Sequence, residues 1–209
     1  MDEKLDFQKK YRELYLPRKG TVSRVTVPLL RYLAVDGTGA PESQDYQQSV
    51  QILYTLAFTI KMSKLHPVQP MGYVDFRVPP LEGLWDCAGS GFDPNRDAWS
   101  WTSMLCMPEF VTEETVAWAV EEARKKHPEL PLGRARLFLY DEGRCAQLLH
   151  FGPYTAEQAS IDRLGDFIRE QGLRDDCGAV RRHHEIYLSD PRRTQPDRLR
   201  TVLRHPVRP

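Results

Sequence analysis

Two segments with helical periodicity, each set among shorter segments of alternating polarity, constrain the fold of this chain more than any other feature. Over residues 46–65, apolar side chains recur on two stripes, which predicts a helix that is buried on two sides. Over 155–171 the spacing is again helical, and Thr155 followed by Gln158 has the form of a capping box. We therefore expect an α+β protein with two strand-helix-strand-strand units in pseudo-twofold arrangement, an antiparallel sheet and a ligand groove between the units.

The whole chain of 209 residues is long enough to bury one sizeable core, so a single domain is expected. We place the first unit at about 22–110 and the second at about 132–190. An amphipathic helix at 5–16, which ends before Pro17, and a terminal helix at 196–204, which begins with proline, should dock on this body.

Alternating segments predict where the strands lie. They occur at 22–35, 73–78, 99–105, 136–140, 145–151 and 180–188. Residues 36–39 (DGTG) should form a turn, and Asp141-Glu142-Gly143 should join a hairpin. Thr112 is the expected N-cap of a further helix that ends near His127.

Charge and cysteine usage exclude several classes of protein. Lys plus Arg and Asp plus Glu both number 29, and this balance disfavours binding to nucleic acid, where a basic face is needed. The four cysteines form no C-x-x-C pair, and no apolar run approaches the ~18 residues of a membrane span. We expect a cytoplasmic protein with neither a nucleic-acid nor a membrane partner.

No cofactor is expected either. The chain has neither a G-x-x-x-x-G-K-[ST] nor a G-x-G-x-x-G loop, which disfavours a nucleotide cofactor. His183 and Glu185 would share one face of a strand and could offer two metal ligands, but a catalytic metal usually needs three. The sequence also lacks a G-x-S-x-G elbow, so hydrolysis through an acyl intermediate is not expected.

The segment HHEIYLSD at 183–190 places one carboxylate in the middle of a strand. Because side chains alternate, His183, Glu185 and Tyr187 would lie on one face, while two apolar residues seat the other face on a core. Imidazole, carboxylate and phenol groups together can bind cationic or aromatic ligands or move protons. An edge strand with a solvated polar face explains the same pattern, and this segment alone leaves the two readings open.

Aromatic residues supply candidate walls for a ligand groove. Trp99 and Trp101 would share one strand face and could form a stacking wall, although core packing explains each of them equally well. Tyr54 lies mid-helix, where a plain core tyrosine is the alternative to a polar partner for water or ligand. The other candidates for ligand contact are Phe58, Trp85, Phe92, Tyr140, His183 and Tyr187.

Five passages of the sequence form a pattern in a fixed order. They are the helix that ends in LYLP (14–17), LAVDGTG (33–39), the helix segment 53–62, VPPLEGLW (78–85), and HEIYLSDP (184–191) followed by LRTVLR (199–204). Their shared order and spacing span almost the whole chain. Together they resemble the GyrI-like small-molecule-binding family, in particular a stand-alone bacterial branch that includes cyclopropanoid cyclopropyl hydrolases.

This resemblance implies an aromatic-walled pocket with an acidic residue at its base, which by motif position is Glu185. It implies binding of flat, aromatic, often cationic compounds. In the hydrolase branch it also implies opening of a strained cyclopropane in DNA-alkylating compounds, a detoxification reaction with Glu185 as base and Tyr54 as its partner. The alternative is a non-catalytic multidrug-binding or sensing module. No helix-turn-helix segment is expected beside it, so a drug-sensing regulator would lack its DNA-binding half; the oligomeric state stays open.

Overall fold

The computed structural model describes residues 4–67, 69–86, 95–178 and 180–209. The helices are α1 (Phe7–Lys10), α2 (Arg12–Tyr15), α3 (Gln44–Met62), α4 (Glu113–Arg124) and α5 (Gln158–Glu170). The strands are β1 (Ser23–Thr38), β2 (Glu82–Trp85), β3 (Ser100–Cys106), β4 (Arg136–Phe151), β5 (Arg174–Asp175), β6 (His183–Tyr187) and β7 (Arg200–Arg208). Short 3-10 turns lie at Ser63–Leu65, Arg96–Ala98, Leu132–Arg134, Tyr154–Ala156 and Pro196–Arg198.

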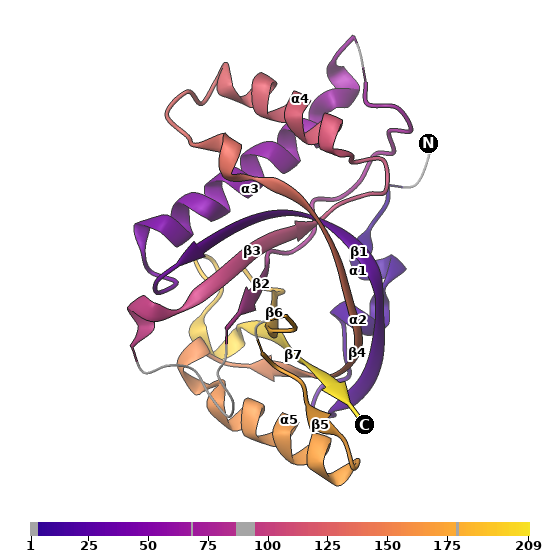
Figure 1. Ribbon diagram of the computed structural model, residues 1–209, viewed down its shortest axis with the longest axis vertical. Helices are drawn as coiled ribbons and strands as arrows, with labels where there is room; N and C mark the ends of the chain where they lie inside the picture. Colours follow the sequence, from indigo (N-terminus) through magenta and orange to yellow (C-terminus); the bar gives the residue numbers. More distant parts are fainter. Residues whose placement is uncertain (1–3, 68, 87–94, 179) are drawn as a thin grey trace.

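The seven strands form one antiparallel sheet in the order β4-β1-β3-β2-β6-β7-β5, and an additional pairing of β4 with β7 closes it on itself (Figure 1). The long strands β1 and β4 curve around the molecule and carry this closure. Closure gives six strands a neighbour on each side, although β1 and β4 are paired on both sides over only part of their length. The expected α+β class with an antiparallel sheet is confirmed.

The expected twofold repeat is present in the order of the strands. One unit runs β1-α3-β2-β3 and the other β4-α5-β6-β7, with the two-residue strand β5 inserted after α5. Within the units the pairing orders are β1-β3-β2 and β4-β7-β6, and the units meet where β1 pairs with β4 and β2 pairs with β6. The short strands β2 and β6 therefore lie side by side at the centre of the repeat.

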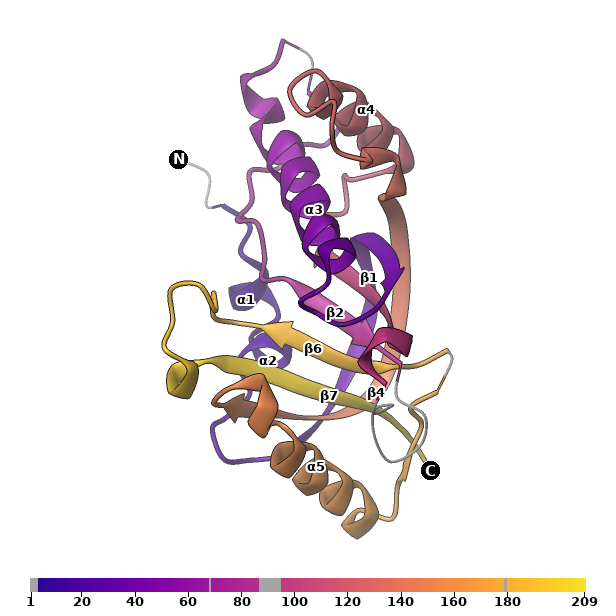
Figure 2. The same ribbon diagram turned by 90° about the vertical axis from the view of Figure 1, so that its left-hand side faces the viewer.

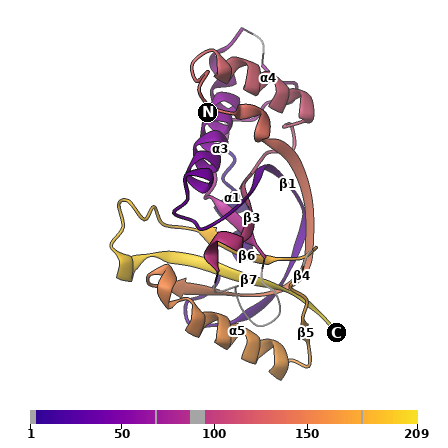
Figure 3. The same ribbon diagram turned by 60° about the vertical axis from the view of Figure 1, so that its left-hand side comes forward.

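The helices divide the outer face of the closed sheet between them. Helices α3 and α4 lie at one end and α5 at the other, and β6 and β7 pass between them (Figures 2 and 3). Buried apolar residues of α3 and α4 pack on β1 and β3, while Leu164 and Ile168 of α5 pack with residues of β4 and β7. A third cluster joins α1 and α2 to the opposite face of the strands. The gap between α3 and α5 is where the site lies.

The inner face of the sheet holds a fully buried charged network. His184 of β6 places Nε2 3.0 Å from Glu82 Oε2 and Nδ1 3.0 Å from Glu142 Oε2. Arg204 Nη1 donates to Glu142 Oε2 at 2.9 Å, and Tyr15 Oη donates to Glu82 Oε1 at 2.6 Å. All five residues are no more than 1% exposed. Two acids therefore face two bases, and each buried charge has a partner.

This network explains why one sequence prediction is wrong. Residues 136–140 and 145–151 do not form a hairpin, because β4 continues through Asp141-Glu142-Gly143 and keeps one register with β1 from Arg136 to Gln147. The Glu142 side chain enters the buried network instead of a solvated turn. Charges next to glycine usually signal a turn, but here the partners that neutralise Glu142 come from distant strands.

The other departures have similar causes. Only Pro196–Arg198 is helical in the segment predicted as a terminal helix, and Arg200–Arg208 is a strand whose two faces are both buried, which hides the alternation. No strand forms at 73–78, where Phe76 makes only a single bridge to Leu5. Strand β1 runs through Thr38, past the expected start of the turn. Helix α5 begins at Gln158 without a side-chain cap, so the capping box at Thr155 is also wrong.

Candidate ligand groove

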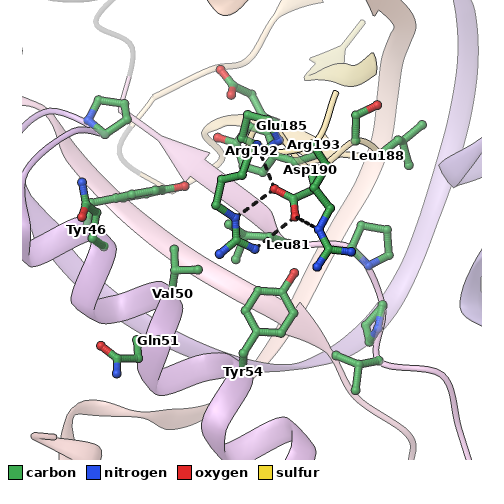
Figure 4. Close-up of a pocket in the computed structure, with 18 of the residues that line it drawn as sticks. Tyr46, Val50, Gln51, Tyr54, Leu81, Glu185, Leu188, Asp190, Arg192 and Arg193 are labelled. Carbon is green, nitrogen blue, oxygen red and sulfur yellow. Dashed lines mark hydrogen bonds and ion pairs between the residues drawn. The ribbon is translucent and has the colours of Figure 1, made fainter. Parts of the chain in front are cut away.

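A groove crosses the outer face of the sheet between α3 and α5, over β2 and β6 (Figure 4). It encloses about 2370 Å³. This is more than the roughly 300–1,000 Å³ of a typical small-molecule pocket, so the site is an open cleft rather than a closed cavity. Its lining combines aromatic rings with several carboxyl groups, of which Glu185 and Glu157 are buried.

Helix α3 supplies one wall. Tyr46, Val50, Tyr54 and Phe58 follow one another at intervals of four residues, so they form one stripe that lines the groove. Figure 4 shows the rings of Tyr46 and Tyr54 projecting from the helix into the groove. The other stripe, with Ile52 and its neighbours, is buried against the sheet. The expectation that this helix is apolar on two sides thus corresponds to one side in the core and one side in the groove.

Glu185 of β6 lies on the floor of the groove and is 7% exposed. Its Oε1 lies 3.0 Å from Nε2 of His183, which is on the same face of β6. Across the sheet Glu185 pairs with Gly83 of β2, and the Trp85 and Tyr187 side chains fill the space where a side chain at Gly83 would lie. A carboxyl group that is hydrogen-bonded to an imidazole and lines a groove can accept a proton or face a positive charge.

An aromatic cluster flanks Glu185. Trp85 Nε1 donates to Tyr187 Oη at 3.0 Å, and the Trp85 ring stacks on Tyr46 at a centroid distance of 5.4 Å. Trp99 packs edge-on against Trp85 at 5.9 Å. Burial, and then the negative charge of Glu185, raise the pKa of Tyr187 well above its ordinary value, so its hydroxyl stays protonated. This end of the groove offers flat apolar faces around a single acid.

The other end of the groove carries a clamp of exposed charges. Asp190 accepts two hydrogen bonds from Arg192, from Nε at 3.0 Å and from Nη2 at 3.1 Å, and Arg193 Nε lies 3.8 Å away (Figure 4). Burial and the charge of Asp190 raise the pKa of Tyr54, which stays a neutral hydrogen-bond donor. Tyr54 therefore presents its hydroxyl group near this clamp.

Glu157, at the start of α5, is the second buried carboxyl group of the groove and is 7% exposed. Its Oε1 has no hydrogen-bond partner among the described residues. Burial, and then the charge of Glu185, raise its pKa from the ordinary 4.5 to about 9. Glu157 therefore keeps its proton at neutral pH, and its surroundings differ from those of Glu185, which is hydrogen-bonded to the His183 imidazole. Divergent environments for two acids are typical of acid–base sites.

The structure brings together many of the residues that the sequence singled out. Tyr54, Phe58, Trp85, Trp99, Glu185 and Tyr187 all line the groove. Trp101 does not: it is 1% exposed and packs beneath the groove, edge-on to Tyr46 at 5.0 Å. Tyr140 is buried on the inner face, and His183 lies behind Glu185. Phe92 lies outside the described residues.

The sequence reasoning missed Glu157, Tyr46 and Asp190 as groove residues. Tyr46 shares the four-residue spacing of Tyr54 and Phe58, so that stripe could have revealed it. Glu157 gave no such signal, because its segment read as a capping box whose acid would be solvated. Asp190 belongs to the motif HEIYLSDP, but its place in the groove depends on the path of the chain after β6.

One group among the described residues could offer three metal ligands. Atoms of Asp175, Cys177 and His205 lie within 4.8 Å of one another. His205 Nδ1 and Asp175 Oδ2, however, are 2.6 Å apart, which is a hydrogen-bond distance. Two ligands of one zinc ion would lie about 3.3 Å apart, given bonds of about 2.0–2.1 Å. As placed, these two atoms bond to each other instead of surrounding an ion.

Comparisons with known proteins agree with this fold. A protein-family model described as "GyrI-like small molecule binding domain" matches residues 115–208. A crystal structure of a hydrolase from Listeria innocua is 46% identical, covers 98% of this chain and 100% of its own, and superposes with a TM-score of 0.91. An uncharacterized conserved protein from Listeria innocua is 48% identical over 98% and 100% of the two chains, with a TM-score of 0.93. The chain belongs to the GyrI-like small-molecule-binding family.

More distant structures share the fold alone. The C-terminal domain of EcmrR is 10% identical and covers 90% of this chain and 97% of its own, with a TM-score of 0.54. No curated protein matches the chain. Within the described residues, no helix has the length and apolar character needed to cross a bilayer.

Proposed function

We propose that this protein hydrolyses the strained cyclopropane of cyclopropanoid alkylating compounds that bind in the groove. The observation that carries the proposal is the placement of Glu185 on the floor of an aromatic groove, hydrogen-bonded to His183 and beside the Trp85–Tyr187 pair. The high identity to a hydrolase from Listeria innocua supports a hydrolytic reaction.

The reaction requires that the protein hold the flat substrate and accept a proton from the attacking water. The three-membered ring of such compounds is conjugated to a dienone, so attack of water on a ring carbon breaks one strained C–C bond. The electron pair moves to the carbonyl oxygen and restores aromaticity. Glu185 takes the proton that water loses, and general-base assistance of this kind contributes about 10²- to 10⁴-fold. The aromatic walls hold the flat substrate and lower the entropic part of the barrier.

Two neutral hydrogen-bond donors, Glu157 and Tyr54, complete the proposed set of reacting and binding groups. Glu157 is protonated at neutral pH and can supply a proton to the carbonyl oxygen as that oxygen becomes a phenol. Tyr54 keeps its hydroxyl proton and can hydrogen-bond the attacking water or the substrate. In this scheme Glu185 and Glu157 exchange states in each turnover, with one gaining the proton that the other loses.

A second candidate function is binding without chemistry. A carboxylate beside stacked tryptophan and tyrosine rings favours aromatic cations, because both the carboxylate and the ring faces attract positive charge. Such a module would sequester or sense drugs. It requires the walls and Glu185 but not the proton donors.

The test is incubation of the purified protein with a cyclopropanoid, followed by chromatography of the ring-opened product. Glu185→Gln should reduce the rate by about 10²-fold or more, whereas Glu170→Gln, an exposed acid on α5, should leave it unchanged. Equal rates in wild type and Glu185→Gln would refute hydrolysis. Titration with a fluorescent aromatic cation then decides whether the groove only binds.

A further inference from the structure

Glu185 is the first member of a chain of four titratable groups joined by three hydrogen bonds. His183 Nε2 lies 3.0 Å from Glu185 Oε1, and His183 Nδ1 lies 2.7 Å from His205 Nε2. His205 Nδ1 lies 2.6 Å from Asp175 Oδ2. Both ring nitrogens of His183 and of His205 therefore take part in hydrogen bonds, and the series of hydrogen bonds from Glu185 to Asp175 is continuous.

This series of hydrogen-bonded side chains crosses the sheet from the groove to strand β5 at the edge of the sheet. His183 and Glu185 share one face of β6, and the antiparallel register with β7, continued by one residue, sets His183 opposite His205. Asp175 of β5 pairs with Val207, two residues along the same face of β7. The side chain of His183 is 1% exposed and that of His205 is 8%, but that of Asp175 is 36% exposed and does not line the groove.

Three hydrogen bonds need three protons. Two neutral imidazoles supply two, so the third proton sits on one of the carboxyl groups or makes one imidazole cationic. These arrangements differ only in the positions of protons along fixed hydrogen bonds. Burial lowers the pKa of His183, which disfavours the arrangement with a cationic His183. Burial raises the pKa of Asp175, but the hydrogen bond from His205, the charge of His205 and the hydrogen bonds from Cys177 together outweigh it and leave that pKa below its ordinary value.

We propose that Glu185, His183, His205 and Asp175 form a proton relay that links the groove to solvent at the opposite edge of the sheet. A proton on Glu185 passes to Nε2 of His183, which passes its Nδ1 proton to Nε2 of His205. His205 passes its Nδ1 proton to Asp175 and so to water, and each imidazole is left as its other tautomer. Because each step is reversible, Glu185 can lose or regain its proton while a flat ligand covers its open side.

The use of this relay in turnover rests on the proposed hydrolysis, but its existence does not. The other titratable groups that face the chain are Glu157, Tyr46, Tyr154 and Tyr187 beside Glu185, His184 beside His183, and Cys177 beside Asp175.

The first experiment compares Asp175→Asn with Asp176→Asn in the cyclopropanoid assay. Asparagine can still accept the hydrogen bond from His205 but cannot carry the proton, while Asp176 is the adjacent acid and pairs with Arg181 instead. We expect Asp175→Asn to lower kcat about tenfold, less than the ~10²- to 10⁴-fold contribution of the base itself, and added imidazole buffer to restore it. Equal kcat in the two variants, or a loss that no buffer restores, would overturn the relay.

The second experiment needs no activity, so it separates failure of the relay from failure of the proposed hydrolysis. The ¹⁵N shifts of the His205 imidazole report its tautomer and charge across a pH titration. We expect Glu185→Gln to change this titration although two hydrogen bonds separate the residues, and Glu170→Gln to leave it unchanged. An identical His205 titration in wild type and Glu185→Gln would overturn the proposal even if the ring is opened.

Discussion

Gly83 and Glu185 are paired directly across β2 and β6, and they are equivalent positions of the two repeated units. The pseudo-twofold axis therefore passes between a residue with no side chain and a residue with a carboxyl group. An ideal repeat would place two acids or two glycines on the floor of the groove. The sequence breaks the symmetry at this pair: Glu185 contributes its carboxyl group from β6, and the Trp85 and Tyr187 side chains fill the space over Gly83.

The first prediction concerns the space at Gly83. A Cβ atom at this position would lie 2.8 Å from Trp85 Nε1 and 3.1 Å from Tyr187 Oη, so Gly83→Ala must displace the hydrogen bond between these side chains. We expect a loss of about 1–3 kcal/mol in unfolding free energy and weaker binding of aromatic ligands. Gly133→Ala is the control, because a Cβ there meets nothing within 4 Å. Denaturant unfolding and ligand titration measure both effects, and equal behaviour of the two variants would contradict the packing described at Gly83.

The second prediction separates two neighbouring tryptophans. Trp99 lines the groove, whereas Trp101 is 1% exposed and packs beneath it. Trp99→Ala should weaken binding of a fluorescent aromatic cation on the order of tenfold and leave the folded state nearly as stable. Trp101→Ala should lower the unfolding free energy by about 3–5 kcal/mol. If Trp99→Ala binds as wild type does, this wall is not part of the ligand site.

The third prediction uses the pH dependence of stability that Glu157 imposes. Its pKa is about 9 when folded and near 4.5 when unfolded, so between these values the folded state holds a proton that the unfolded state has lost. Stability should therefore fall as pH rises through this window, by at most about 1.4 kcal/mol per pH unit. Glu157→Gln removes the effect and should be more stable than wild type at pH 8 but not at pH 4. Glu170→Gln should follow the wild-type profile; a wild-type profile for Glu157→Gln would show that the buried carboxyl is not protonated.

The fourth prediction concerns the buried network on the inner face. The charges of His184 and Arg204 outweigh burial and lower the pKa of Glu142 to about 2, so the network depends on both bases. Arg204→Met leaves Glu142 with one partner and should cost about 3–5 kcal/mol of unfolding free energy. Arg208→Met, at the exposed end of the same strand, should cost at most about 1 kcal/mol. Thermal unfolding compares the two, and similar losses would mean that Glu142 does not need Arg204.

Local patterns were enough to predict the repeat and much of the groove. These predictions depend only on residues that are close in sequence: the helical spacing over 46–65, the alternation around Glu185 and the aromatic residues near Trp85. Strand β7 could not be predicted in this way, because both of its faces are buried and its segment begins with a proline. Glu142 and Glu157 were misread for a related reason. Their charges are neutralised by partners or by protonation that only the closed sheet provides.

The asymmetry between Gly83 and Glu185 has a consequence for the orientation of any bound ligand. A flat, symmetric molecule could enter a groove with exact twofold symmetry in two equivalent poses. With Glu185 in one unit and Gly83 in the other, the two poses are no longer equivalent. A flat ligand that carries a positive charge at one end should therefore bind in one direction, with that end at Glu185.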